Sequence, residues 1–560
     1  MSSTPSILEQ ESVEQCRPWN VADTSDLHSA ASDCRSLLVS LLSRRQKIQF
    51  CLMVSAWAAG LLSFYLWWFR SDHFVSVFGL LLNTLLLTWT LCLPAYFFFF
   101  VFRMQRVNKE LQLPVGWRVA MVTTRAPSEP FPVVRKTLEA MLSQHYPHET
   151  WLADEDPTDE IIEWCLENGI RISTRKGVAE YHRETWPRRT KCKEGNLAYF
   201  YDCCGYEQFD YVVQLDADHV PQDHYLEEML KPFLDPAVGY VSGPSICSKN
   251  SEFSWAARGR LYSEAIMHGP LQAGYSAGFA PLCIGSHYAV RTEALRQIGG
   301  LGPELAEDHT TTLMMNAHGW RGVHALDAIA VGEGPPTLAD CITQEFQWSR
   351  SLMVVLLTVL PKYWSQLPGK LRFQFLFSEL WYPLFSVTMF CGLTLPILAV
   401  ATKHPMVQVS YLDFLLHSVP VTALTLAIPW FLKQQGCLRP CDSPVFTWEM
   451  GLFQVIRWPW AAYGSIMGLF TVVCRRNVAF RVTPKGTEHP ASLPWKVLTP
   501  YIAVLALTWL PTLFVKDAGA AEGYFFFLIL SQIVYSLALL LIVLIHRHEV
   551  TKQKKGYSEP

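Results

Sequence analysis

Two acids one residue apart end an apolar run near the middle of this 560-residue chain. The segment Tyr211–Gln222 reads YVVQLDADHVPQ, so Asp216 and Asp218 close what we expect to be a buried strand, where an unpaired carboxylate is costly. At a strand end, residues i and i+2 point to the same side, and Mg²⁺ or Mn²⁺ is commonly held by such carboxylates together with substrate phosphates. The pair is therefore a candidate metal site, although a D-x-D triplet alone is equally typical of a helix cap or a solvated loop.

The segment from about Gln105 to Leu371 alternates strand-like and helix-like patterns. RVAMVTT, TWLAD, IRIST and YVVQLDAD predict strands, and VVRKTLEAMLSQ, EIIEWCLENG and EGNLAYFYDCCG predict helices between them. Such alternation indicates an α/β fold with a parallel sheet, whose ligands bind at the carboxyl ends of the strands. Asp154 ends the second predicted strand, and Asp216 and Asp218 end the fourth. All three acids thus fall where a ligand is expected.

The composition places this insert in a membrane protein. Half of the residues are hydrophobic and only 17% are charged. A membrane-spanning helix needs about 20 apolar residues. Six segments of the chain qualify: Phe50–Phe69, Phe74–Phe102, Phe375–Val400, Phe414–Leu432, Val497–Val515 and Tyr524–Ile545. Phe446–Cys474 is also apolar but contains Glu449, Arg457 and three tryptophans, so we expect an amphipathic helix at the interface, although a seventh span would look similar.

Basic residues near the span ends predict the orientation. SRRQK, FRMQRVNK and HRHEVTKQKK flank one side of the spans, whereas RSDH, TKHP and VKDAGAAEG on the other side are poor in Lys and Arg. By the positive-inside rule, both termini and the large insert face the cytoplasm of a plasma (inner) membrane. A net charge of −3 gives no reason to expect a nucleic-acid partner, and fifteen scattered cysteines without a C-x-x-C pair fit a reducing compartment.

Seven segments, in this order, resemble the motifs of processive family 2 glycosyltransferases such as the bacterial cellulose synthase catalytic subunit and curdlan-type β-glucan synthases. They are LADEDPTDE (152–160), KEGN (193–196), LDADHVP (215–221), CIGSHYAVRTEAL (283–295), AEDHTTTLMMNAHGW (306–320), QEFQWSR (344–350) and FRVTPKG (480–486). Each motif alone is weak, but seven in the right order are specific. The last resembles a gating loop of cellulose synthase that hyaluronan and chitin synthases lack, and this favours a glucan synthase.

The resemblance implies a cytoplasmic α/β domain of the GT-A glycosyltransferase type, inserted between α-helical transmembrane segments and accompanied by amphipathic interface helices. The implied division of the chain is a tail (1–48), two transmembrane helices (49–103), the GT-A domain (104–343), interface helices (344–374), two transmembrane helices (375–433), an interface helix with the gating loop (434–493), two transmembrane helices (494–546) and a tail (547–560).

The implied activity is an inverting, metal-dependent transfer of glucose from UDP-glucose to the non-reducing end of a growing polysaccharide, which leaves through a channel in the same protein. The implied partners are UDP-glucose or another UDP-sugar, the nascent polysaccharide, the lipid bilayer and accessory subunits. Cellulose, a β-1,3-glucan and a mixed-linkage glucan are all compatible products. A synthase using UDP-GlcNAc, a non-processive membrane transferase, and a transporter or inactive scaffold are the competing interpretations.

The resemblance also implies roles for individual residues around the donor. Asp216 and Asp218 would hold Mg²⁺ or Mn²⁺, and Asp308, with Glu307 beside it, would act as the general base. The implied UDP-binding residues are Thr123, Glu129 and Asp154 for the uridine, Lys193 and Arg350 for the diphosphate, and Phe480, Val482, Thr483 and Lys485 of the gating loop. Without the resemblance, Glu307 and Asp308 would simply favour the positive end of the following helix.

On the acceptor side, Trp348 would form a platform for the terminal sugar, because an aromatic ring packs well on the apolar face of a sugar. Gln344, Gly285 and Ser286 would line the same region. The chain departs from the family pattern at several positions: Gln347 replaces the usual Arg, Ala306 the usual Thr, Ile284 the usual Cys, and Glu155 and Asp156 the usual Asp-Gly. These changes surround the donor and acceptor, so the sugar or the linkage can differ from cellulose.

Overall fold

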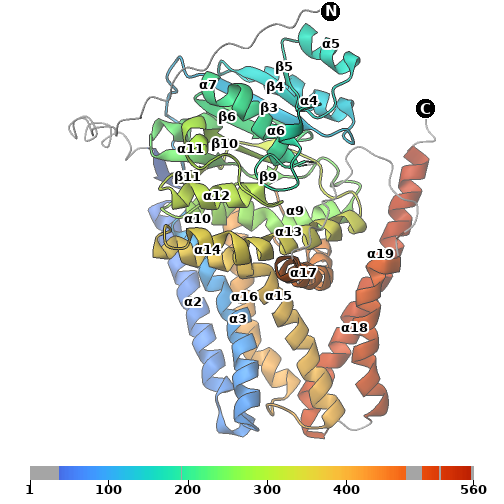
Figure 1. Cartoon of the computed structure of the whole chain (residues 1–560). Coiled ribbons are helices and arrows are strands. Elements are labelled where there is room, and N and C mark those ends of the chain that lie inside the picture. The colour runs from blue at the N-terminus through green and yellow to red at the C-terminus, as the bar shows by residue number, and fades with distance from the viewer. Residues whose placement is uncertain (1–36, 191, 475–492, 494, 516–518, 557–560) are drawn as a thin grey trace, which may run out of the picture.

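The computed structural model describes residues 37–190, 192–474, 493, 495–515 and 519–556. An α/β domain lies at one end of the molecule, and long helices extend away from it (Figure 1). Helices α13 (Leu338–Thr358) and α14 (Leu360–Tyr363) run across the boundary between these two parts (Figure 1). The division into an α/β insert and flanking apolar helices is therefore as predicted.

The α/β domain is built on a seven-stranded sheet in the order β11-β8-β10-β6-β3-β4-β5. The strands are β3 (Val119–Arg125), β4 (Glu149–Asp154), β5 (Arg171–Ser173), β6 (Tyr211–Leu215), β8 (Val238–Ser242), β10 (His287–Arg291) and β11 (Arg321–His324). The prediction of a purely parallel sheet is wrong, because β10 runs antiparallel to both β6 and β8. Alternating strands and helices indicate crossover connections, but they do not reveal the direction of a strand inserted between two others.

Apolar clusters cover both faces of this sheet, because successive strand residues point to opposite sides. One cluster joins Met121 and Val213 to helices α4 (Phe131–Leu142) and α8 (Tyr225–Leu230). The other joins Ala120, Val122 and Val212 to side chains of further helices. Besides α4 and α8, the α-helices of the domain are α5 (Asp159–Glu167), α6 (Lys193–Phe200), α7 (Tyr206–Gln208), α9 (Trp255–Ile266), α10 (Gln272–Tyr275), α11 (Thr292–Gln297) and α12 (Glu307–Ala317).

A second, three-stranded sheet lies beside the first and has the order β7-β12-β9. Its strands are Val220–Pro221 (β7), Ser245–Ile246 (β9) and Ala330–Val331 (β12). β7 begins two residues after Asp218, so this small sheet fixes the chain directly after the D-x-D triplet.

Six helices are long and apolar enough to cross a membrane, among the residues that the structure describes. They are α2 (Arg44–Trp68), α3 (Val77–Phe102), α15 (Gly369–Thr402), α16 (Tyr411–Gln434), α18 (Trp495–Phe514) and α19 (Glu522–Gly556), the last as a span up to Glu549. They correspond one to one with the six predicted spans. α17 (Trp448–Cys474), the segment predicted to lie at the interface, is not among the six.

α17 packs tightly against α13 (Leu338–Thr358), which precedes the short α14 (Leu360–Tyr363). A Cβ at Gly464 or Gly468 of α17 would collide with the backbone of α13, so glycine permits this close approach. A buried ion pair joins the same two helices, with Arg457 Nη2 2.7 Å from Glu345 Oε2.

Strands or helices extend into both segments that were predicted as tails, 1–48 and 547–560. Leu38–Ser40 forms strand β1, which pairs antiparallel with β2 (Gln105–Val107), and α2 begins at Arg44. The Ser43 side chain accepts a hydrogen bond from the backbone N–H of Gln46 and caps α2, so polar residues that were predicted as tail are the start of a helix. At the other end, α19 continues to Gly556 through most of the predicted tail at 547–560.

Candidate active site

The antiparallel direction of β10 brings the predicted acceptor segment to the D-x-D triplet. His287, the first residue of β10, pairs with Leu215, the last residue of β6. The backbone N–H of Asp216 donates to the carbonyl oxygen of Ser286 at 2.7 Å. Gly285 and Ser286 therefore lie directly beside Asp216. The correction to the predicted sheet thus explains how the two motifs meet.

Lys193 connects three of the predicted motifs. It is the first residue of α6, and its Nζ donates to Asp216 Oδ1 at 2.8 Å and to the carbonyl oxygen of Gly285 at 2.6 Å. The glycine of the same KEGN segment, Gly195, has no room for a side chain, because a Cβ there would collide with the Arg189 carbonyl and the Arg175 guanidinium. The structure therefore explains both the lysine and the glycine of this motif by close contacts.

The two acids of the triplet differ in their surroundings. The Asp216 side chain is 31% exposed, whereas Asp218 is 1% exposed. Asp218 Oδ2 accepts the backbone N–H of Glu333 at 2.8 Å, and the Asp218 carbonyl accepts from Lys249 Nζ. Asp218 is thus fixed from the chain after β12, while Asp216 faces an accessible space.

Asp216, Asp218 and His219 form a group that could hold a metal ion, with one donor atom from each within 4.8 Å of the others. Burial alone would lower the pKa of His219, but the charge and hydrogen bond of Asp218, with a contribution from Cys247, raise that pKa to about 9. Asp216 and Asp218 are thus each paired with a basic side chain, Lys193 and His219 respectively. The oxygens of the two carboxylates are the kind of ligand that Mg²⁺ or Mn²⁺ prefers.

Asp308 lies on the other side of Gly285, in the first turn of α12. A Cβ at Gly285 would be 3.3 Å from Asp308 Oδ2, and Asp308 Oδ1 accepts the backbone N–H of His309 at 2.8 Å. Burial raises the pKa of the Asp308 carboxyl, and burial together with the charge of Asp308 raises the pKa of Glu307 to about 8. At neutral pH, Glu307 is therefore mostly protonated.

Hydrogen bonds fix α12 against the acceptor segment and against α13. Thr312 Oγ1 donates to the Asp308 carbonyl at 2.9 Å and accepts the Cys283 N–H at 2.9 Å. The backbone N–H of Ala306, which replaces the threonine of the family motif, donates to Ser351 Oγ on α13 at 3.1 Å. The position of Asp308 thus depends on both the catalytic domain and the crossing helix.

The three residues predicted to line a uridine pocket lie near the ends of β3 and β4. Asp154 is fully buried and accepts Arg125 Nη1 with both oxygens, at 3.1 and 3.0 Å. Glu129 Oε2 accepts the Ala126 N–H at 2.9 Å. The buried Thr123 hydroxyl has no hydrogen-bond partner among the described residues. In the sheet, Thr123 of β3 pairs in register with Leu215 of β6. The structure thus brings these residues to the same sheet edge as Asp216.

The predicted acceptor residues on α13 lie against α9. The Arg260 guanidinium lies 4.1 Å from the ring centre of Trp348 and donates to Gln344 Oε1. Gln347 is 9% exposed. Arg350, predicted to contact the diphosphate, is buried and directs Nε toward Thr471 Oγ1 of α17 at 3.4 Å, so its visible contact belongs to the helix interface.

The predicted gating-loop residues Phe480, Val482, Thr483 and Lys485 lie outside the described residues. Other residues of the site were missed from the sequence. His219 directly follows the triplet and Arg125 is the last residue of β3, so their positions offered a signal. Lys249 and Arg260 are brought in by the fold over long sequence distances, and no local pattern marks them.

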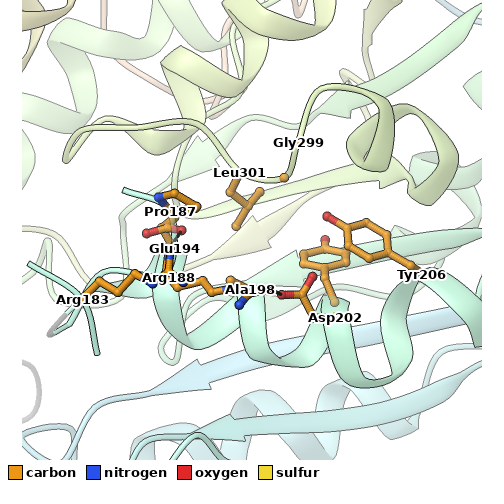
Figure 2. Close-up of a pocket in the computed structure, with 11 residues that line it drawn as sticks. Arg183, Pro187, Arg188, Glu194, Ala198, Asp202, Tyr206, Gly299 and Leu301 are labelled. Atoms are coloured by element: carbon orange, nitrogen blue, oxygen red, sulfur yellow. Dashed lines mark hydrogen bonds and ion pairs between the residues drawn. The ribbon is translucent and has the colours of Figure 1, made fainter. Parts of the chain in front are cut away.

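A separate cavity of about 320 Å³ lies along α6 (Figure 2). Arg188, Asp202, Tyr206 and Leu301 are among the residues that line it, and Arg188 Nη2 lies 2.9 Å from Asp202 Oδ2. None of the predicted donor residues within the described part of the chain lines this cavity. It is therefore distinct from the site around Lys193 and Asp216.

Family comparisons agree with this geometry. Residues 120–299 match the family described as Glycosyl transferase family 2, and residues 211–431 match Glycosyl transferase family group 2. The chain thus contains a glycosyltransferase family 2 domain. The GT-A fold expected for this glycosyltransferase is present, with a mixed rather than parallel sheet.

The glycosyltransferase is similar to curated bacterial proteins. It is 27% identical over 257 residues to the cellulose synthase catalytic subunit [UDP-forming] of Xanthomonas axonopodis pv. citri (strain 306), covering 44% of this chain and 33% of that protein. It is 24% identical over 419 residues to the cellulose synthase catalytic subunit [UDP-forming] of Pseudomonas fluorescens (strain SBW25), covering 70% and 51%. The matched regions thus span about a third to a half of the length of these relatives.

Two solved structures are also similar to the glycosyltransferase. One is the mannosyltransferase PcManGT from Pyrobaculum calidifontis in complex with GDP-Man and Mn²⁺, at 13% identity and a TM-score of 0.33, covering 85% of this chain and 97% of that one. The other is glucosyl-3-phosphoglycerate synthase from Mycobacterium tuberculosis with Mn²⁺ and UDP, at 15% identity and a TM-score of 0.29, covering 45% and 82%. No residue role follows from similarities at this level.

Proposed function

We propose that this glycosyltransferase is a processive, inverting β-glucan synthase that uses UDP-glucose and extends a polysaccharide at its non-reducing end. The observation that carries the proposal is the position of Gly285, whose carbonyl accepts from Lys193 and whose Cα lies beside Asp308. A cation for the leaving group and a carboxylate for the attacking hydroxyl thus flank one segment. The relatives called cellulose synthase catalytic subunits support glucose as the transferred sugar.

On the donor side, Asp216 and Asp218 would hold Mg²⁺ or Mn²⁺, which when bound neutralises charge on the diphosphate. Lys193 would exchange part of its contact with Asp216 for a phosphate oxygen, because its Nζ is already within 2.8 Å of that carboxylate. Asp154 and Thr123 would meet the uridine. Asp154 can accept a uracil N–H while keeping Arg125, since a carboxylate offers more than two acceptor positions.

On the acceptor side, Asp308 would take the proton of the sugar hydroxyl as its oxygen attacks the anomeric carbon. Direct displacement inverts the configuration, so an α-linked donor gives a β-linked product. Burial and the charge of Asp308 raise the pKa of Glu307 to about 8, so Glu307 would add little negative charge beside Asp308 at neutral pH. Trp348, with Arg260 against its ring, would support the terminal sugar.

The path of the polymer would follow α13 and α15. Buried side-chain oxygens on these helices have no hydrogen-bond partner among the described residues: Glu345 Oε1, both oxygens of Glu379, and Ser386 Oγ. Buried acceptors without partners are unfavourable, and sugar hydroxyls passing along the helices would satisfy them. We propose that export occurs here, with the catalytic domain and both termini on the cytoplasmic side of the plasma membrane.

The deciding experiment supplies UDP-glucose with Mg²⁺ or Mn²⁺ to the purified protein in lipid nanodiscs and digests the product with linkage-specific glucanases. Release of long β-glucan, absent in Asp218→Asn, supports the proposal. Polymer made only from UDP-GlcNAc, or transfer of a single sugar, overturns it. In proteoliposomes with donor on one face, polymer confined to the donor side would disprove export.

A further inference from the structure

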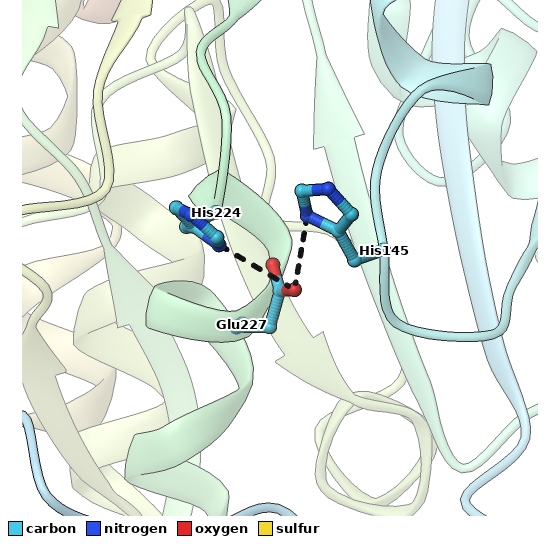
Figure 3. Close-up of side chains that lie close together, drawn as sticks. All are labelled: His145, His224 and Glu227. Atoms are coloured by element: carbon cyan, nitrogen blue, oxygen red, sulfur yellow. Dashed lines mark ion pairs between the residues drawn. The ribbon is translucent and has the colours of Figure 1, made fainter.

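Two histidines and a glutamate converge on the surface of the catalytic domain, apart from the predicted donor and acceptor residues. His145 follows α4, while His224 and Glu227 lie before and within α8 (Figure 3). Glu227 Oε1 lies 3.6 Å from His145 Nδ1 and 3.9 Å from His224 Nδ1. The two imidazole rings stack with centres 5.0 Å apart, and donor atoms of all three residues lie within 4.8 Å of one another.

Gln144 fixes the two chain segments that supply this cluster. Its side-chain Nε2 donates to the Gln222 carbonyl at 3.1 Å, and its Oε1 accepts the Leu226 N–H at 3.0 Å. Gln144 is 7% exposed, so these bonds are shielded from water. Residue 145 is thereby held against residues 222–226, and the cluster is preorganised by a buried side chain rather than by its own contacts.

Two further observations point to a ligand. Glu227 Oε2 is buried and has no hydrogen-bond partner among the described residues. His224 adopts a left-handed backbone with φ of 63°, a conformation that is uncommon outside glycine and is often retained for function. Glu227 thus has one oxygen beside the two exposed imidazoles and a second oxygen without a partner among the described residues.

The distances fit one metal ion. Zinc binds histidine nitrogen and carboxylate oxygen at about 2.0–2.2 Å in tetrahedral geometry, which separates neighbouring donor atoms by about 3.4 Å. The separations of 3.6 and 3.9 Å exceed this only slightly, so small rotations of the two exposed rings would close the site. Two imidazoles and one carboxylate favour Zn²⁺ over Mg²⁺, which prefers oxygen ligands.

We propose that His145, His224 and Glu227 form a surface site for a zinc-type divalent cation, separate from the site of Asp216 and Asp218. The site has three protein ligands and leaves the fourth position to water. His224 follows β7 and lies six residues beyond Asp218, whereas His145 follows α4. An ion bound here would therefore connect the end of α4 to the chain that leaves the D-x-D triplet. The proposal concerns binding and is independent of the sugar transferred.

The test is calorimetric titration of Zn²⁺ into the full-length protein in nanodiscs, after alkylation of exposed thiols such as Cys203 and Cys441. We expect one binding event that weakens at least about 10-fold in His224→Asn, His145→Asn and Glu227→Gln. Asparagine suits position 224 because it tolerates the left-handed conformation. Asp218→Asn and the exposed-histidine control His404→Asn should retain this event.

Unchanged affinity in the three ligand variants overturns the proposal and leaves only ion pairs between protonated histidines and Glu227. Loss of the event in Asp218→Asn instead assigns it to the D-x-D triplet and also overturns it. A second measurement needs no variant: Zn²⁺ should protect His145 and His224, but not His404, from diethyl pyrocarbonate. Equal modification of all three histidines with and without Zn²⁺ contradicts the site.

Discussion

The imidazole of His309, the residue after Asp308, faces Glu379 on helix α15, with Nε2 3.5 Å from Glu379 Oε1. Glu379 is fully buried, and neither of its oxygens has a hydrogen-bond partner among the described residues. The backbone of His309 donates to Asp308 Oδ1. A candidate membrane-spanning helix thus contacts the residue that positions the proposed general base.

We therefore expect Glu379→Gln to lower kcat by about 10-fold, a barrier change of about 1.4 kcal/mol, with little change in KM for UDP-glucose. Removing the carboxylate releases His309 and, through its backbone, the orientation of Asp308. Initial rates of UDP release would measure both constants. Thr388→Val is a matched control, because Thr388 lies on the same helix and its hydroxyl donates to the Leu384 carbonyl one turn earlier. A rise in KM alone would contradict a positioning role.

Lys193→Met should reduce kcat by about 10²–10³-fold, because it removes a preorganised cation from the developing charge of the leaving group. Lys176→Met should have little effect, since Lys176 is exposed and paired with Asp156. Protein folding is checked by size-exclusion chromatography in detergent. If Lys193→Met keeps the wild-type rate, the diphosphate does not bind beside Asp216.

Glu307→Gln should make stability less dependent on pH. The pKa of Glu307 rises from an ordinary 4.5 to about 8 in the folded protein, so the folded state binds more protons than the unfolded state between these values. Stability of the wild type therefore falls as pH rises through this window, whereas glutamine cannot ionise. The increase in apparent Tm of Glu307→Gln over wild type should be small near pH 5 and largest above about pH 8.

Scanning fluorimetry across that pH range would test this, and equal Tm differences at every pH would contradict it. Activity should be largely retained in Glu307→Gln near neutral pH, because glutamine resembles the protonated acid. Asp308→Asn, by contrast, should abolish transfer, since it removes the base itself.

Gly195→Ala should destabilise the start of α6, because its Cβ would collide with the Arg189 carbonyl and the Arg175 side chain. Overpacking of this kind typically costs about 1–3 kcal/mol. The change should also displace Lys193 and lower kcat. Gly451→Ala on α17, where a Cβ meets nothing within 4 Å, is the control and should leave both Tm and rate unchanged.

Trp348→Ala should shorten the polymer and raise the concentration of acceptor needed for transfer, because the terminal sugar loses its aromatic platform. Trp348→Phe should recover part of the chain length, since a smaller ring still packs on a sugar face. Size distribution of radiolabelled product is the measurement. Wild-type polymer length in Trp348→Ala would place the acceptor elsewhere.

Local patterns were sufficient to predict much of the site. The strand that ends in Asp154 and the strand that ends just before Asp216 lie where the apolar runs predicted, because burial and turn chemistry are local properties. The direction of β10 was missed, since an apolar run does not encode which way it enters the sheet. The Lys193–Gly285 and His309–Glu379 contacts join residues far apart in sequence, and only the folded chain defines them.

Arg350 illustrates a different limit. Its position two residues after Trp348 predicts a cation near the diphosphate, yet its guanidinium reaches toward Thr471 on α17. Helical periodicity predicts the face of the helix on which a residue lies, but it does not predict which neighbouring side chain that residue contacts. The burial of Asp218 could not be predicted for a similar reason, because its partner Glu333 lies just after β12, more than a hundred residues later in the chain.

Strands β1 and β2 pair across the helical hairpin formed by α2 and α3, with Ser40 opposite Gln105. The two strands can meet only when both helices have been placed antiparallel, so that the entry and exit of the hairpin lie on one side of the bilayer. During biogenesis, this short ladder would close only after the first two helices are inserted in full. The ladder therefore holds the chain that enters α2 against the chain that leaves α3 toward the α/β domain.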